Sequence, residues 1–302
     1  MAIHRIAVFG ATGTQGHPVV DAGLDAGLSV RAVSRDPEAA EQKLSARVEV
    51  VEADLNDADS VTAALEGMEG VFFHLPAVPD SGMLPAMADN VLDGARSAGI
   101  KRLVFTTGAH CGELMPAGAL VDGLRKVSAA ILDSGVPAVV LRPTLYLANL
   151  VWPHLISEIR DFGRLSYPPL DPDRRVSWTA TEDQGRIAVA CMNADVAGQT
   201  LDIASPEPVT GAELARMLAG VYGREVHFAP QGLDEFGGDL AAMSGSGDFG
   251  RSVAELYEGI NRMPPEGLII DTGPIEEKLD VELIPVSCWV RDYYGRLLEL
   301  YG

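Results

Sequence analysis

Cysteine is scarce in this chain of 302 residues, and the three that occur, Cys111, Cys191 and Cys288, lie far apart without a Cys-x-x-Cys pair. Such cysteines predict neither a disulfide framework nor a metal site. Uninterrupted apolar runs fall well below the roughly 18 residues that a membrane span requires. The first predicted strand begins at Ile3, which leaves no room for a secretory signal. We therefore expect reduced thiols and a cytoplasmic protein.

Positive charge is also scarce. There are 23 Lys and Arg residues and 43 Asp and Glu residues, which gives a formal net charge of −20 at pH 7. A chain this acidic is disfavoured as a direct partner of DNA, RNA or an anionic membrane surface. We therefore expect a small-molecule substrate, with no nucleic-acid and no membrane partner, and we leave a homodimer open.

Glycine, in contrast, is concentrated in the heptad GATGTQG, from Gly10 to Gly16, directly after the apolar run of residues 6–9. Glycines at i, i+3 and i+6 allow a strand to turn sharply into a helix and leave room for a phosphate group. The N–H groups of the turn and the positive end of the helix dipole then face that phosphate. The heptad therefore predicts a dinucleotide-binding turn.

Short apolar runs alternate with helical patterns in the first half of the chain. We predict strands over residues 3–9, 28–33, 47–52, 70–75, 101–107 and 137–142, and helices that begin near Gln15, Pro37, Asp57, Leu84 and Gly118. This alternation predicts an α/β fold of the Rossmann type, a doubly wound parallel sheet with a smaller C-terminal α/β substrate-binding portion. We assign residues 1–150, with 176–204 returning to them, to the cofactor-binding domain. The substrate-binding portion then comprises residues 151–175 and 205–302.

The second half of the chain is less regular. We predict a short strand at residues 176–180, a helix at 181–193, a last parallel strand at 199–204 and a helix at 210–222. Thr210 is the predicted N-cap of that last helix, and Glu213 completes a capping box. Segment 237–250 is rich in Gly and Ser and predicts a flexible linker, with a lid over the substrate cleft as the alternative.

The end of the second predicted strand indicates which dinucleotide fits. An NAD site usually has Asp or Glu there, whereas this chain has Ser34 and Arg35. An arginine can pair with a 2′-phosphate through its planar guanidinium group. Asp36 follows, but Asp36 and Pro37 match the N-cap and the first position of the next helix. We therefore predict NADP(H) as the cofactor.

Several segments together resemble the NmrA-like proteins, an atypical branch of the short-chain dehydrogenase/reductase superfamily. They are VFGATGTQG, VSRDP, VVEADLND, LVFTTGA and SGVPAVVLRPTLYLANL, and later motifs follow in the expected order. The resemblance implies a set of cofactor-binding residues: Gly10, Thr12, Gly13, Thr14, Gln15 and Gly16 at the diphosphate, Arg35 at the 2′-phosphate, Asp54 and Leu55 at the adenine, Leu75, Pro76 and Ala77 at the nicotinamide ribose, and Thr107 at the end of the fifth strand. The alternative for Asp54 is a turn or capping role, and we predict His74 to be a core histidine with its hydrogen bonds satisfied.

The Tyr-x-x-x-Lys pair of ordinary superfamily members is absent, because Asp122 lies four residues before Lys126. In that pair the lysine lowers the pKa of the phenol, which then donates a proton. Our candidates for catalytic residues are Tyr146, His110 and Lys126. Cys111 is a weaker candidate, since nothing in the sequence predicts a lowered pKa for its thiol.

A site without a dedicated acid suits hydride transfer to an acceptor that itself accommodates the electron pair. We therefore predict an NADPH-dependent oxidoreductase acting on a quinone-like or other conjugated or aromatic small molecule, for which positioning is the main requirement. Candidate walls of the substrate cleft are the aromatic residues Tyr146, Trp152, Phe162 and Trp178, with a place in the hydrophobic core as the alternative for each. The alternative is an NADP(H)-binding redox sensor of the NmrA type that regulates a partner without turnover.

Overall fold

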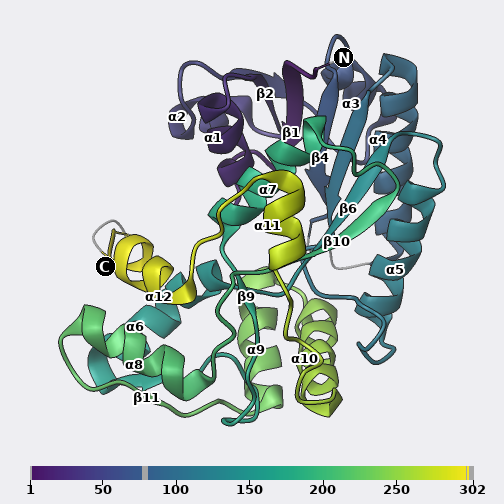
Figure 1. The fold of residues 1–302 in the computed structure, drawn as a ribbon. Helices are drawn as coiled ribbons and strands as arrows, with labels where there is room; N and C mark the ends of the chain where they lie inside the picture. The colour runs from purple at the N-terminus through teal and green to yellow at the C-terminus, as the bar shows by residue number, and fades with distance from the viewer. Residues whose placement is uncertain (1, 77–80, 297, 299–302) are drawn as a thin grey trace.

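A parallel sheet of seven strands forms the centre of the structure, a computed structural model that describes residues 2–76, 81–296 and 298 (Figure 1). The strands run in the order β10-β6-β5-β4-β1-β2-β3, and each neighbouring pair is parallel. Their bounds are β1 Arg5–Phe9, β2 Ser29–Ser34, β3 Glu49–Glu52, β4 Gly70–His74, β5 Arg102–Thr106, β6 Ala138–Pro143 and β10 Gln199–Ile203. The predicted Rossmann-type fold is confirmed. The strand order reverses at β1, which is where such a sheet binds ligands.

Helices cover both faces of the sheet, which explains why its inner strands β1, β4, β5 and β6 are mostly apolar and buried. On β1, Ile6 and Val8 belong to the apolar layer under α1 and α7, whereas Ala7 and Phe9 belong to the layer under α3, α4 and α5. The helices around the sheet are α1 His17–Asp25, α2 Pro37–Lys43, α3 Ala58–Leu65, α4 Leu84–Ala98, α5 Ala119–Leu132, α7 Thr181–Asn193 and α11 Gly273–Leu279. These two layers fix the carboxyl ends of the strands, where polar residues gather.

The rest of the chain forms a smaller portion below the sheet in Figure 1, around buried aromatic residues that include Tyr167, Trp178 and Trp289. Here β7 pairs with β9 and β8 with β11. The elements are β7 Leu145–Tyr146, η2 Leu147–Val151, α6 Pro153–Phe162, β8 Arg164–Leu165, β9 Trp178–Thr179, α8 Gly211–Tyr222, β11 His227–Phe228, α9 Leu233–Ser244, α10 Gly247–Arg262, α12 Val286–Trp289 and the π-helical turn η3 Val290–Tyr294. Within the described residues, no helix is both long and apolar enough to cross a bilayer.

Side-chain caps fix several helix starts where the sequence predicts them. The Asp36 carboxylate accepts a hydrogen bond from the Ala39 N–H at 3.0 Å and caps α2. Thr210 and Glu213 form the predicted capping box at the start of α8. The helix expected near Gln15 begins two residues later, at His17, with Gly16 as its N-cap. These predictions of helix starts are confirmed to within two residues.

The Gly- and Ser-rich segment 237–250 is helical except at Gly245 and Ser246, so the prediction of a flexible linker is wrong. Gly245 ends α9 with a φ of +71°, and the Ser246 hydroxyl accepts a hydrogen bond from the Phe249 N–H to cap α10. The glycines let the two helices approach closely, because a Cβ at Gly250 would lie 2.2 Å from the carbonyl oxygen of Gly237. Tertiary packing therefore overrides the low helix propensity of glycine.

Candidate functional site

The turn after β1 needs its glycines for two different reasons. Gly10 has a φ of +67°, and a Cβ there would lie 2.4 Å from Nε2 of His74. Gly16 packs against the start of the turn, where a Cβ would lie 2.2 Å from the carbonyl oxygen of Gly10. At Gly13 a Cβ would meet only that carbonyl oxygen, at 3.3 Å. The glycines therefore present backbone without side chains at three positions of the turn.

A cleft of about 590 Å³ extends from this turn across the carboxyl ends of β2, β3 and β4. The predicted cofactor residues that line it are Gly10, Thr12, Gly13, Arg35, Asp54, Leu55 and Pro76. Thr14, Gln15, Gly16, Leu75 and Thr107 do not line this cleft, and Ala77 lies outside the described residues. The structure therefore brings the predicted adenosine and 2′-phosphate residues together with Gly10, Thr12 and Gly13, but not with the other three predicted diphosphate residues.

Two cationic side chains border the end of the cleft that β2 and α2 form, Arg35 after β2 and Lys43 in the last turn of α2. Both are exposed, and neither forms an ion pair in the part of the chain that the structure describes. Ser34 fixes the local backbone, since its hydroxyl accepts from the Asp36 N–H at 3.1 Å. The sequence analysis missed Lys43, although Ala39, Ala40 and Lys43 recur at helical spacing and share the face of α2 toward the cleft.

Asp54 lines the cleft and also holds a turn, which is the alternative role that the sequence left open for it. Its Oδ1 accepts hydrogen bonds of 2.9 Å from the backbone and side-chain nitrogens of Asn56. The backbone N–H of Asp54 donates to the Ser60 hydroxyl at 3.2 Å. These bonds hold the turn before α3, so Asp54 keeps its place at the cleft independently of any ligand.

His74 carries a buried nitrogen without a partner. Its Nδ1 lies 3.3 Å from the Leu75 carbonyl oxygen, but Nε2 forms no hydrogen bond with any residue that the structure describes, so the prediction of a fully satisfied core histidine is wrong. Burial lowers the pKa of His74, which keeps the ring neutral near pH 7. The ring lines the cleft directly beneath Gly10. A buried polar atom without a partner beside an open glycine turn fits a site that is completed by a polar ligand.

Tyr146 is buried in a network of hydrogen bonds. Its hydroxyl lies 2.6 Å from Oε1 of Gln184 and 3.1 Å from Oε1 of Gln15. Burial raises the pKa of Tyr146 well above its usual value of 10. The hydroxyl has a single proton, and the shorter contact assigns it to Gln184. Tyr146 therefore donates inside the protein in this structure.

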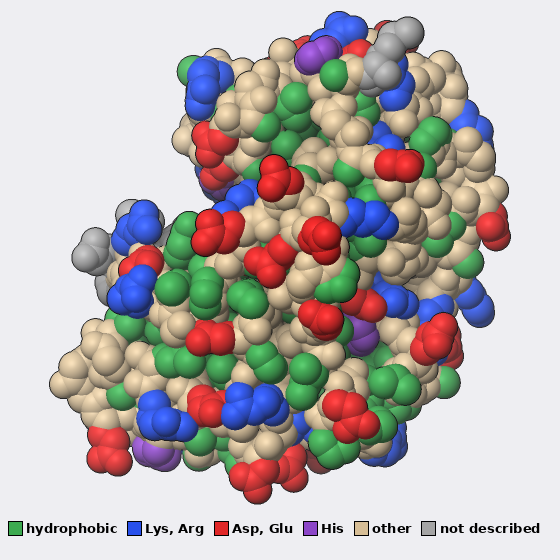
Figure 2. Space-filling model, viewed as in Figure 1, with side chains coloured by type: hydrophobic (Ala, Val, Ile, Leu, Met, Phe, Trp, Pro, Cys, Tyr) green, Lys and Arg blue, Asp and Glu red, His purple; other side chains and the backbone are tan. Residues whose placement is uncertain are grey.

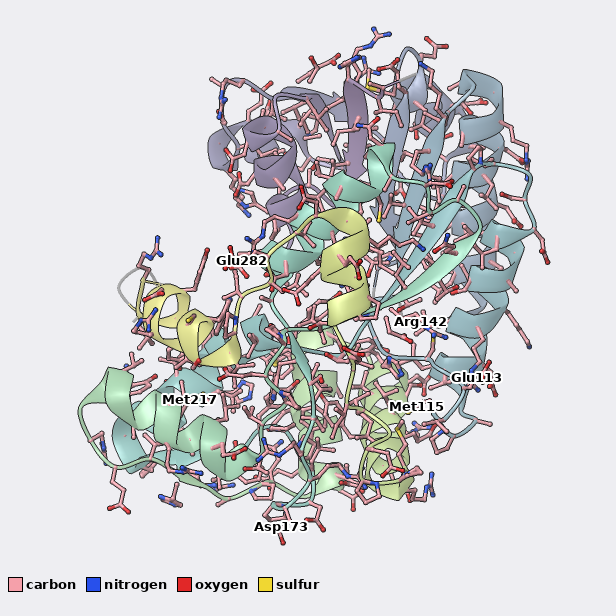
Figure 3. The ribbon with its side chains drawn as sticks, viewed as in Figure 1. Glu113, Met115, Arg142, Asp173, Met217 and Glu282 are labelled. Carbon is pink, nitrogen blue, oxygen red and sulfur yellow. The ribbon has the colours of Figure 1, made fainter. Side chains whose placement is uncertain are left out.

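His110 follows β5 and lies beside an ion pair at the edge of the sheet. Arg142 of β6 and Asp202 of β10 form a bidentate pair with two bonds of 2.8 Å, and Nδ1 of His110 lies 3.8 Å from Asp202. Figure 3 shows Arg142 above the loop that carries Glu113 and Met115. Burial lowers the pKa of His110, and the negative charge of Asp202 acts in the opposite direction and raises it.

Lys126 lies exposed on α5. No hydrogen bond or ion pair joins Tyr146, His110 and Lys126 to one another among the residues described. The three candidate catalytic residues therefore do not form one hydrogen-bonded group in the structure.

Thr107 and Cys111 are held inside the loop after β5. The Thr107 hydroxyl donates to the Ala109 carbonyl oxygen at 2.7 Å. Cys111 is buried, and burial raises the pKa of its thiol, which disfavours a nucleophilic thiolate. The loop is fixed by Arg125 of α5, whose guanidinium donates to the carbonyl oxygens of Cys111, Gly112 and Met115.

A second cleft, of about 640 Å³, lies on the other side of the glycine turn. Its walls come from α1, η2, α7 and the C-terminal helical turns, and Thr12, Gly13 and Thr14 border it. Figure 2 shows a hollow on the left of the molecule, between the two portions that Figure 1 separates at α1 and α12. Neither cleft is lined by any of the predicted aromatic walls, Tyr146, Trp152, Phe162 and Trp178. Trp178 is fully buried, which matches the core alternative, whereas Phe162 is 73% exposed.

Comparisons with known proteins agree with this geometry. The sequence profile of the NmrA-like family matches residues 3–232. An NAD(P)H azoreductase from Xenophilus azovorans is 28% identical over 89% of this chain and 91% of its own. A (4-alkanoyl-5-oxo-2,5-dihydrofuran-3-yl)methyl phosphate reductase from Streptomyces griseus is 30% identical over 76% of this chain and 78% of its own.

Among solved structures, the NADPH-dependent quinone oxidoreductase of Escherichia coli in complex with NADPH shares the fold. Its TM-score is 0.74 at 20% identity, over 98% of this chain and all of that one. The glycine turn, the sheet order and the extent of the profile match agree with one another. This chain therefore belongs to the NmrA-like family.

Proposed function

We propose that this protein is an NADPH-dependent oxidoreductase that transfers hydride to a quinone-like or other conjugated small molecule. The observation that carries the proposal is the cleft on which the open glycine turn, Arg35 and Lys43 converge. The names of three relatives support the acceptor class, because azo compounds, dihydrofuranones and quinones are all conjugated systems.

The cleft residues divide the binding of NADP(H) among them. Among the described residues, the backbone N–H groups of Thr12, which lines this cleft, and of Thr14, which lines the second cleft, have no hydrogen-bond partner and suit a diphosphate. Arg35 and Lys43 supply positive charge for a 2′-phosphate, and Leu55 supplies an apolar surface for the adenine. His74 offers its free Nε2 beneath the turn. When bound, NADPH supplies the hydride.

Proton delivery is proposed to come from solvent. The Tyr146 and Thr107 hydroxyl protons are donated to Gln184 and to the Ala109 carbonyl, so we propose that both residues hold the site in shape. A quinone that accepts a hydride becomes a stabilised oxyanion, which takes up its proton without a positioned acid. Lys126 is exposed on α5 and lines neither cleft, so we propose no part for it in proton delivery.

We also propose that residues 1–150 and 176–204 act as the cofactor-binding part, with residues 151–175 and 205–302 as the substrate-binding part. Pairing of β10 with β6 in the central sheet supports the return of 176–204. The second cleft, between the two parts, supports a substrate entrance beside the glycine turn.

The test offers purified protein a panel of benzoquinones, naphthoquinones and azo dyes with NADPH or NADH and follows the loss of reduced-cofactor absorbance. Steady turnover with NADPH that exceeds turnover with NADH is the expected result. NADPH binding without turnover on any acceptor would refute the enzyme proposal. It would support an NADP(H)-binding sensor instead, which the internal donation of the Tyr146 and Thr107 protons also favours.

A further inference from the structure

The side chain of Gln184 in α7 is fully buried, at 0% exposure, and each polar atom of its amide is bonded. Its Oε1 accepts from the Tyr146 hydroxyl at 2.6 Å and from the Thr106 hydroxyl at 3.2 Å. Its Nε2 donates to the main-chain carbonyl oxygen of Gln15 at 3.4 Å. The amide therefore connects α7, β5, β7 and the glycine turn through one neutral group.

The backbone of α7 lies unusually close to the first turn of α1. A Cβ at Gly185 would lie 2.3 Å from the carbonyl oxygen of Pro18. Glycine at position 185 thus allows the contact, and Gln184 beside it reaches the turn. The side chain of Gln15 lies against the same network, 3.1 Å from the Tyr146 hydroxyl. Contacts with α7 therefore help to fix the shape of the glycine turn, in addition to the glycines of the turn itself.

The charged side chains near Gln184 are directed elsewhere. Asp183 pairs with Arg186 and accepts from the Ile284 N–H at 2.9 Å. Glu182 accepts from the Trp289 indole N–H at 3.0 Å. Among the described residues, Tyr146 is the only titratable group with a hydrogen bond to the Gln184 side chain. A charge introduced at this position would therefore be buried without a countercharge.

We propose that Gln184 is a positioning residue for the cofactor: it holds the glycine turn in the shape that binds the diphosphate of NADP(H). This inference rests on the proposed function. This role requires a side chain that has both a hydrogen-bond acceptor, for Tyr146 and Thr106, and a hydrogen-bond donor, for the Gln15 carbonyl. A carboxylic acid satisfies both requirements while it is protonated, because one oxygen accepts and the O–H donates to the Gln15 carbonyl. A carboxylate presents only acceptors to that carbonyl.

The experiment measures NADPH affinity by calorimetry between about pH 5 and pH 8 for wild type, Gln184→Leu and Gln184→Glu. Gln199→Leu is the matched control, since its amide bonds Lys278 at the surface. We expect Gln184→Leu to bind about tenfold more weakly at every pH, the scale on which one hydrogen bond changes an equilibrium. We expect Gln184→Glu to match wild type at the acidic end and to weaken relative to it as pH rises, because burial raises the pKa of the introduced acid.

Each outcome separates the two proposals. Wild type that fails to bind NADPH refutes both. Wild type that binds NADPH while Gln184→Leu binds it equally well refutes the positioning role alone, as does an affinity ratio of Gln184→Glu to wild type that stays constant with pH. Melting curves confirm that each variant is folded at the temperature of the titration. If Gln184→Leu does not fold, the pH series of Gln184→Glu still decides the question.

Discussion

Replacement of Arg35 by alanine tests the cofactor assignment most directly. Arg35 is exposed at the end of the cleft, and Lys43 is the other cation there. A charge-assisted hydrogen bond contributes about 1.5–3 kcal/mol. Solvent screening of an exposed group places Arg35 near the lower end of that range, about 1.5–2 kcal/mol. This corresponds to an approximately 10- to 30-fold weaker NADPH affinity, since about 1.4 kcal/mol is tenfold.

The assay titrates NADPH and NADH into wild type, Arg35→Ala and Arg251→Ala. Arg251 is paired with Asp248 on α10, outside the cleft, so its replacement removes the same charge without touching the site. Only NADPH affinity should fall in Arg35→Ala, and the loss should shrink at high salt. An unchanged NADPH affinity, or an equal fall for NADPH and NADH, would show that Arg35 does not recognise the 2′-phosphate.

Three further predictions concern the turn, the pH dependence of stability and the thiols. Gly16→Ala should abolish cofactor binding in titrations, because its Cβ would lie 2.2 Å from the carbonyl oxygen of Gly10; binding within twofold of wild type would contradict this. Burial raises the pKa of Asp183 to about 6, above its unfolded value. Wild type should therefore lose stability relative to Asp183→Asn as pH rises from about 4 to 7, by on the order of 2–3 kcal/mol in urea unfolding, and a constant difference would refute the assignment. Half-buried Cys288 should be alkylated before both buried cysteines in peptide mapping, whereas earlier labelling of Cys111 would contradict its burial.

The sheet could be predicted from sequence because its information is local. Strands buried on both faces are continuous apolar runs, and caps such as Asp36 and Thr210 mark helix starts by chemistry that acts within one turn. The helices α9 and α10 were not predicted because the glycines in their sequences are typical of residues that interrupt helices. Even so, Gly245 followed by Ser246 is a helix end followed by a helix start, a signal that could have been found.

The site was predictable in part for the same reason. The turn residues and Arg35 follow their strands directly, so their place in the cleft comes from the parallel topology. The partners of Tyr146 could not be predicted from the sequence, because Gln184 is remote from it along the chain. The packing of α7 on α1 brings the two side chains together. His74 was misjudged because a single sequence gives no indication that its neighbour Gly10 leaves Nε2 without a partner.

The contact of Gly185 with Pro18 bears on how the protein is made. During synthesis, α1 and the glycine turn leave the ribosome long before α7, and β10, which pairs with β6, follows later still. Until then Val19 and Val20, which are buried in the finished protein, have no helix to cover them. A nascent chain that stops before residue 181 therefore exposes an apolar face, and we expect chaperones to bind it. We therefore expect the chain to bind its cofactor only late in translation, although the glycine turn is among the first residues made.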